Sequence, residues 1–132
     1  MAKTKVLIIG IEPSLIDFTD GLYALAGSAA AVLAGLETDE AHLNGLGYAA
    51  ELCLVDFGAT APTVLRDRLR QTVFDCIVIG AGIRMIPRNT FLFETLVNTV
   101  RSEAPQATLC FSTRPTDTAE AVQRWVLPAK PA

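Results

Sequence analysis

Four short apolar runs, each followed by a polar or glycine-rich turn and then by helical periodicity, limit the fold of this chain more than any other feature. They are Lys5–Ile9, Leu52–Val55, Cys76–Ile79 and Leu109–Phe111. Alternating strand-like and helix-like segments are typical of an α/β domain built on a parallel sheet. The first run is apolar on both faces, as a central strand must be when helices cover both sides. The pattern therefore predicts a three-layer α/β/α domain with a four-stranded parallel sheet.

The length of 132 residues and the hydrophobic fraction of 51% fit one domain with a core on each face of the sheet. We expect residues 1–127 to form this single domain and residues 128–132 to form a flexible C-terminal tail. Helical periodicity and end signals predict four helices. Their expected limits are Ser28 to Leu46, Pro62 to Gln71, Asn89 to Ser102 and Asp117 to Leu127.

Local signals refine two of these helices. Ser28 can cap the first helix, because a serine hydroxyl accepts a hydrogen bond from a free N–H group. Ala31 and Gly35 lie one turn apart on that helix, and their small size predicts close packing on the sheet. Asp117 and Glu120 have the spacing of a capping box, so the last helix is expected to begin there.

Right-handed crossovers and central placement of the most apolar strands favour the flavodoxin-like strand order 2-1-3-4. Ligands of such sheets bind beyond the carboxyl ends of the strands at the switch point, here between strands one and three. We expect a crevice between the loops at residues 10–27 and 80–88, with Ser112-Thr113-Arg114 beside it. The first loop exceeds the roughly 2–6 residues of an ordinary βα connection. It is either a binding loop or a contact with a partner subunit.

Seven polar side chains are expected at this crevice. The expected ligand-binding residues are Ser14, Arg84, Arg88, Thr113 and Arg114. Guanidinium groups and helix N-termini both donate to anions, so a carboxylate or phosphate ligand fits. If the site is catalytic, Glu12 or Asp17 is the expected general acid or base, because an apolar environment raises a carboxyl pKa. In the alternative interpretation, Arg84 or Arg88 pairs with Glu12 or Asp17 to hold the long loop. Arg114 then only covers a helix end.

Other chemistries lack the residues that they need. His42 is the only histidine and is expected on the surface of the first helix, which argues against a Ser-His-Asp or Cys-His site. Gly80 and Gly82 follow a strand but lack the third glycine of a dinucleotide fingerprint. No metal-binding or cofactor-binding motif is present, so no cofactor is assigned. The three cysteines fall within predicted strands without CxxC spacing, which predicts buried free thiols.

Charge and hydropathy bear on partners and location. Acids dominate residues 1–60 and bases residues 61–132, which predicts an intramolecular match or a head-to-tail contact between subunits. Arginines interspersed with acids predict no nucleic-acid partner. The mean hydropathy is +0.38, but the longest uncharged stretch, residues 21–36, is shorter than the roughly 20 residues of a spanning helix. We expect a cytoplasmic homo-oligomer without a secretory signal or membrane segment.

Three segments, Val6–Ser14, Asp75–Arg84 and Thr113–Pro115, resemble an uncharacterised family of small bacterial flavodoxin-like α/β proteins. The resemblance covers nearly the whole chain and implies its fold, but it implies no activity. The layout is also similar to flavodoxins, low-molecular-weight tyrosine phosphatases and response-regulator receivers. The residues after the first strand, Gly10–Ser14, lack the phosphate loop, nucleophilic cysteine and acidic pair of those proteins. Their functions therefore do not transfer to this chain.

Two hypotheses for function follow. The leading one is binding of a small anionic metabolite at the carboxyl ends of strands one, three and four. The alternative is a noncatalytic oligomeric or regulatory module, in which the long first loop contacts other subunits or partners. The sequence identifies no reaction.

Overall fold

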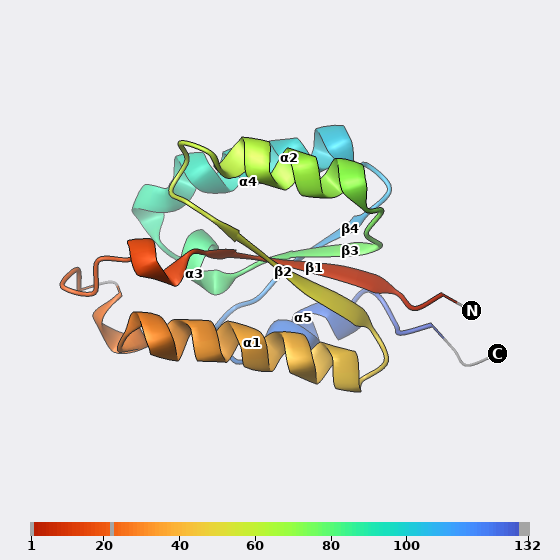
Figure 1. Cartoon of the computed structure of the whole chain (residues 1–132), viewed down its shortest axis with the longest axis horizontal. Helices are drawn as coiled ribbons and strands as arrows, with labels where there is room; N and C mark the ends of the chain where they lie inside the picture. The colour runs from red at the N-terminus through yellow and green to blue at the C-terminus, as the bar shows by residue number, and fades with distance from the viewer. Residues whose placement is uncertain (1, 22, 130–132) are drawn as a thin grey trace.

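Helices cover both faces of a four-stranded parallel sheet in the computed structural model of the chain (Figure 1). The structure describes residues 2–21 and 23–129. The strands are β1 (Lys5–Ile11), β2 (Ala49–Val55), β3 (Cys76–Ile79) and β4 (Thr108–Phe111). They lie in the order β2-β1-β3-β4, and each neighbouring pair is parallel. This confirms the predicted α/β fold and its flavodoxin-like strand order.

Helical segments connect the strands. The α-helices are α1 (Ala29–Gly45), α2 (Ala61–Gln71), α3 (Ala81–Arg84), α4 (Thr90–Glu103) and α5 (Thr118–Gln123). Three 3₁₀ turns, η1 (Pro13–Leu15), η2 (Ala24–Ala26) and η3 (Pro87–Asn89), divide the long loops. These turns and α3 are too short to give a periodic signal, so sequence patterns did not predict them. No helix in the described part of the chain has both the length and the apolar character needed to cross a bilayer.

The sheet has two differently covered faces, because successive side chains of a strand point to opposite sides. Leu7 and Ile9 of β1 face α2 and α4, and this side is called the α2/α4 face. Val6 and Ile8 pack with residues of α1 and α5. This side of the sheet, which α1 and α5 cover in Figure 1, is called the α1/α5 face. Each face therefore has its own apolar cluster.

Several element limits differ from the prediction, and β2 begins at Ala49, three residues before the predicted Leu52. β1 runs through Gly10 to Ile11, because β2 pairs with it along its whole length. The last helix ends at Gln123, four residues before the predicted Leu127. Carbonyl groups beyond it bond elsewhere, since the Tyr48 hydroxyl donates to the Val126 carbonyl at 2.6 Å. The flexible tail at residues 128–132 stays a prediction, and residues 130–132 lie outside the described residues.

The predicted start of the last helix is confirmed, because α5 begins directly after Asp117, but only one of the two expected caps makes a side-chain bond to its helix. Ser28 Oγ accepts from the Ala31 N–H group at 3.1 Å and caps α1. Asp117 precedes α5, but its carboxylate accepts from the N–H groups of Thr113 at 2.9 Å and Arg114 at 3.2 Å. It therefore closes the preceding loop and makes no cap bond to the helix. Burial acts to raise the pKa of Asp117, but these hydrogen bonds outweigh it and hold the pKa below its ordinary value.

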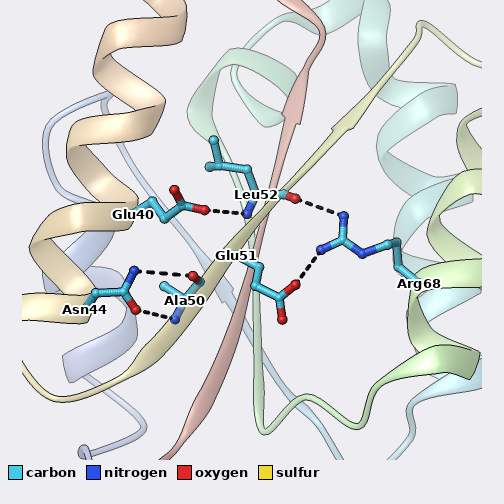
Figure 2. A network of polar contacts seen from close by, with 6 residues as sticks. All are labelled: Glu40, Asn44, Ala50, Glu51, Leu52 and Arg68. Atoms are coloured by element: carbon cyan, nitrogen blue, oxygen red, sulfur yellow. Dashed lines mark hydrogen bonds and ion pairs between the residues drawn. The ribbon is translucent and has the colours of Figure 1, made fainter.

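Side chains from both flanking helices cover the outer edge of β2 (Figure 2). The Ala50 N–H group donates to Asn44 Oδ1 at 2.8 Å, and Asn44 Nδ2 donates back to the Ala50 carbonyl at 3.4 Å. The Leu52 N–H group donates to Glu40 at 3.1 Å, and its carbonyl accepts from Arg68 at 2.9 Å. An open edge invites pairing with a strand of another chain. These contacts occupy the outward backbone groups of Ala50 and Leu52, which are then not free to pair with a strand of another chain.

Candidate functional site

A cavity of about 350 Å³ opens at the carboxyl ends of β1 and β3, on the α1/α5 face. Its apolar walls include Ile8 and Ile11 of β1, Leu36 of α1 and Ile83 of α3. Small-molecule sites commonly have volumes of roughly 300–1,000 Å³, so this cavity suits a compact ligand. It lies at the switch point between strands one and three, where the strand order predicts a ligand crevice.

Small residues leave this space open. Gly35 of α1 and Gly82 of α3 line the cavity, and a Cβ atom added to either one would meet no atom within 4 Å. The predicted close packing of Ala31 and Gly35 on the sheet is therefore wrong, since both residues border the cavity. Leu43 is the buried residue of α1 and packs on the sheet near the end of that helix. The first half of α1 stands beside open space.

Asp39 supplies the acidic group of the cavity wall. The Thr118 hydroxyl of α5 donates to Asp39 Oδ2 at 2.9 Å. Burial raises the pKa of the Asp39 carboxyl, and the hydrogen bond from Thr118 opposes part of that rise. Within the described residues no lysine or arginine lines the cavity. The described wall therefore combines apolar surface with one carboxyl group and no lysine or arginine.

Two other polar side chains on the wall are already hydrogen bonded. The Tyr23 hydroxyl donates to the Gly82 carbonyl at 3.1 Å and accepts from Asn89 Nδ2 at 2.9 Å. Ser112 Oγ accepts from the Ala81 N–H group at 2.8 Å. These bonds join the connection before α1 and the end of β4 to the loop after β3. They hold the cavity in shape without help from a ligand.

The two predicted catalytic carboxylates belong to local turns. Glu12 accepts from the Ser14 hydroxyl at 3.1 Å at the start of η1. Asp17 accepts from the Thr19 hydroxyl at 2.6 Å and from its N–H group at 2.9 Å, and these bonds lower the pKa of Asp17. Neither carboxylate lines the cavity. Their role as acid or base stays a prediction, and the lowered pKa of Asp17 does not favour it.

Arg88 holds the long connection between β1 and α1. It forms an ion pair with Asp20, and its guanidinium carbon lies 6.0 Å from the centre of the Tyr23 ring. This arrangement corresponds to the alternative in which an arginine holds the loop, but the partner is Asp20 and not Glu12 or Asp17.

The other two arginines lie near the carboxyl end of β4. Arg84 donates to the Ser112 carbonyl at 3.3 Å, and its guanidinium carbon lies 5.8 Å from the centre of the Phe111 ring. Its Nε is buried, and no described residue accepts a hydrogen bond from it. Arg114 is exposed and donates from Nε to the Thr116 hydroxyl at 3.3 Å. Neither arginine lines the cavity, so an anion held by them would bind outside it.

The remaining predicted binding residues also serve their own loops. Ser14 donates to Glu12, as described above, and the Thr113 hydroxyl donates to the Asp117 carboxylate. Both residues are exposed, and neither lines the cavity. The structure therefore separates the seven predicted residues into local pairs around the cavity, and their role in ligand binding stays a prediction.

The cysteines are buried and free, as predicted. The sulfurs of Cys76 in β3 and Cys110 in β4 are 3.2 Å apart on the α1/α5 face, whereas Cys53 lies in the cluster of the other face. His42 is exposed near the end of α1. Residues 2–21 and 23–129 contain no group of three or more His, Cys, Asp or Glu arranged to hold a metal ion.

Asp39 is the acidic residue of the cavity that the sequence analysis missed. It lies seven positions after Val32, three after Leu36 and four before Leu43, which places it on the apolar stripe of α1. Acidic residues are rarely buried unless they have a partner or a function. A carboxylate inside an apolar stripe is the signal that could have identified it.

Comparison of this chain with family models, curated proteins and solved structures gives no significant match. The fold agrees with the coarser part of the resemblance, a small parallel α/β domain with flavodoxin-like strand order. The function has to be argued from the residues of the cavity, because a fold alone does not define an activity.

Proposed function

We propose that this protein binds a small organic molecule whose apolar part fills the cavity between α1 and the carboxyl ends of β1 and β3. The observation that carries this proposal is a preformed cavity of about 350 Å³ with mainly apolar walls. A ligand that removes such walls from water gains roughly 25 cal/mol for each Å² of apolar surface. Tyr23 and Ser112 already fix the surrounding loops, so binding requires little ordering of the chain.

The test is a fragment screen followed by amide NMR on the labelled protein. The panel contains small aromatic and aliphatic molecules with neutral, cationic, carboxylate and phosphate groups. Fragments that bind in the cavity are expected to shift the amide signals of Gly35, Gly82 and Ser112, which all line it. A panel that moves none of these signals contradicts the proposal.

A pair of glycine variants on α1 tests the location. Gly35→Leu places a side chain in the cavity, where no atom blocks it, and is expected to abolish the fragment shifts. Gly45→Leu is the matched control, because Gly45 lies on the same helix, also has open space around it and does not line the cavity. Fragment binding that is unchanged in Gly35→Leu places the ligand elsewhere.

Binding of a small anionic metabolite through Arg84, Arg88 and Arg114 is a second ligand proposal. The exposed Arg114 supports it, since its guanidinium group has unused capacity to donate. The carboxylates and phosphates of the same panel test it. Arg84→Ala and Arg114→Ala are each expected to weaken anion binding while the fold stays intact, and unchanged affinity in both variants rejects this assignment.

A noncatalytic oligomeric module is the competing function, and exposed leucines near the cavity favour it. Leu25 is 99% exposed and lines the cavity, and Leu15 is 50% exposed on the same connection. Apolar groups exposed together often mark a contact with another chain. Light scattering coupled to size exclusion tests the homo-oligomer, which Leu25→Ser is expected to weaken. A monomer at high concentration rejects it.

A cytoplasmic location is part of the same proposal. Three buried free cysteines are usual in a reducing compartment, which supports this location. Membership of the small bacterial family that the sequence resembles is also retained as a proposal, and it adds no activity.

A further inference from the structure

Asp39 gives the largely apolar cavity a carboxylate that can accept hydrogen bonds from a ligand. Thr118 occupies its Oδ2 at 2.9 Å. No other described residue donates a hydrogen bond to this carboxylate, so Oδ1 has unused capacity to accept. The bond from Thr118 also fixes the orientation of the carboxylate, because it ties α1 to α5.

Negative charge predominates around Asp39. Burial raises the pKa of Asp39 most strongly, and repulsion from Asp117 and Glu120 adds to the rise. The Thr118 hydrogen bond and attraction to His42 oppose it. No lysine or arginine of the described chain lines the cavity to balance the charge. A partly buried carboxylate without a cation is unfavourable, and a cationic ligand would remove that penalty.

We propose that the cavity binds a small amine, whose N–H groups donate to Asp39 while its apolar part contacts the cavity walls. This inference rests on the proposed function, because it names the class of molecule that the same cavity takes. An ammonium group meeting Oδ1 forms a charge-assisted hydrogen bond. Such a bond is stronger in an apolar, water-poor cavity than in bulk water.

The same geometry disfavours other ligand charges. A carboxylate or phosphate inside the cavity would lie beside Asp39 without a protein cation, so repulsion would weaken its binding. A neutral alcohol can donate one hydrogen bond to Asp39 but lacks the attraction of a full charge. The expected order of affinity is therefore amine, then alcohol, then carboxylate.

Three probes test this order: 2-phenylethylamine, 2-phenylethanol and 3-phenylpropionate. They share a phenyl group and differ in the charge of the polar end. In amide NMR titrations of the full chain at neutral pH, the amine is expected to bind about tenfold or more tightly than the alcohol, the usual effect of a charged hydrogen-bond partner. The carboxylate is expected to bind most weakly.

Two variants assign the preference to Asp39. Asp39→Asn keeps the shape and an acceptor for Thr118 but removes the charge, so the amine affinity is expected to fall to that of the alcohol. The alcohol affinity is expected to stay unchanged. Glu120→Gln is the matched control, because it removes a nearby negative charge that does not line the cavity and should keep the amine preference.

The outcomes separate this inference from the proposed function. Cavity shifts of equal affinity for all three probes overturn the role of Asp39 and leave the cavity function standing. An amine preference that survives in Asp39→Asn also overturns the inference. In that case Asp39 would only tie α1 to α5, and its substitution would change stability without changing the ratio of amine to alcohol affinity. The absence of cavity shifts with these probes and with the fragment panel contradicts both.

Discussion

The two faces of the sheet are packed differently, although the same strands supply both. On the α2/α4 face, each helix buries three residues: Ala61, Leu65 and Leu69 from α2, and Leu92, Leu96 and Val100 from α4. On the other face, α1 buries only Leu43. Yet α1 has 17 residues against 11 in α2. The extent of packing therefore does not follow from helix length.

The difference follows from side-chain size and placement. In α2, Leu65 and Leu69 are large and lie one turn apart on the sheet side, while Arg68 reaches the edge of β2 and Arg70 is exposed. The first half of α1 consists mostly of alanine, glycine, valine and leucine, and its small residues do not fill the space over β1 and β3. One face is thus a close-packed support, and the other retains a cavity that a ligand can fill.

Leucine truncations on the two faces are the strongest test of this difference. Leu96 is fully buried on the α2/α4 face, so Leu96→Ala is expected to lower the free energy of unfolding by about 2–5 kcal/mol. Leu36 is partly exposed and already borders a cavity, so Leu36→Ala is expected to lower it by only about 1 kcal/mol. Urea denaturation followed by circular dichroism measures both. Equal losses would mean that the α1/α5 face is packed as closely as the other.

A substitution of Asp117 tests the part of the α1/α5 face that lies outside the cavity, where polar side chains already have partners within the protein. Its carboxylate joins Thr113 and Arg114 and is buried, so Asp117→Ala is expected to lower stability by about 1–3 kcal/mol at neutral pH. The exposed Glu120 is the control, and Glu120→Ala should change stability by no more than about 0.5 kcal/mol.

The effect of Asp117 should also depend on pH with a definite sign. Because its pKa is lowered in the folded protein, the stability it contributes is present above its ordinary pKa of 3.8 and is lost as the pH falls through the folded value. The difference in stability between the unmodified protein and Asp117→Ala should therefore narrow in acid. A difference that is constant with pH contradicts this account of the carboxylate.

The fold was predictable because each strand and each long helix has a pattern that can be recognised within its own short segment of sequence. The apolar run at Cys76–Ile79 indicates a strand buried on both faces, and all four of its residues are buried. The cap at Ser28 follows from the chemistry of one residue and its neighbours. Asp117 marks the start of α5 as predicted, but its carboxylate makes no cap bond, because it accepts from N–H groups of the preceding loop.

The location of the candidate site was predictable, but the residues that line the cavity were not. Strand order places a crevice between β1 and β3, and a cavity lies there. Which side chains line it depends on how far α1 stands from the sheet, and no local pattern contains that distance. Small residues at Ala31 and Gly35 are compatible with close packing and with open space, and only the tertiary structure decides between them.

Glycine-to-alanine changes in and just after α1 test the packing of this face through smaller changes in stability. Gly35→Ala is expected to raise stability by up to about 1 kcal/mol, because alanine favours the helix and its Cβ meets no atom within 4 Å. Gly45→Ala should behave similarly. Gly47, with a φ of +101°, is the contrasting position, and Gly47→Ala should lower stability by about 1 kcal/mol. Thermal unfolding measures all three. A loss in Gly35→Ala would mean that α1 lies closer to the sheet than the cavity allows.

Asp39→Asn is the smallest expected effect, and its sign is opposite to that of Asp117→Ala. Because burial raises the pKa of Asp39, the folded protein holds this proton more tightly than the unfolded chain. The resulting stability is present below the ordinary pKa of 3.8 and is lost as the pH rises through the folded value. At neutral pH the ionised carboxylate therefore opposes folding, and Asp39→Asn is expected to raise stability by less than about 1 kcal/mol.

This gain should disappear in acid, where the carboxyl group is protonated in both states. His42, Asp117 and Glu120 are present in both proteins, so the difference between the two curves reports the Asp39 carboxyl group together with its interactions with these three residues. Urea denaturation from acid to neutral pH measures it. A loss of stability at neutral pH would mean that the carboxylate has a stabilising partner within the protein. In that case Asp39, like Asp117, would already be stabilised by groups of the protein. An amine would then find no unpaired carboxylate in the cavity.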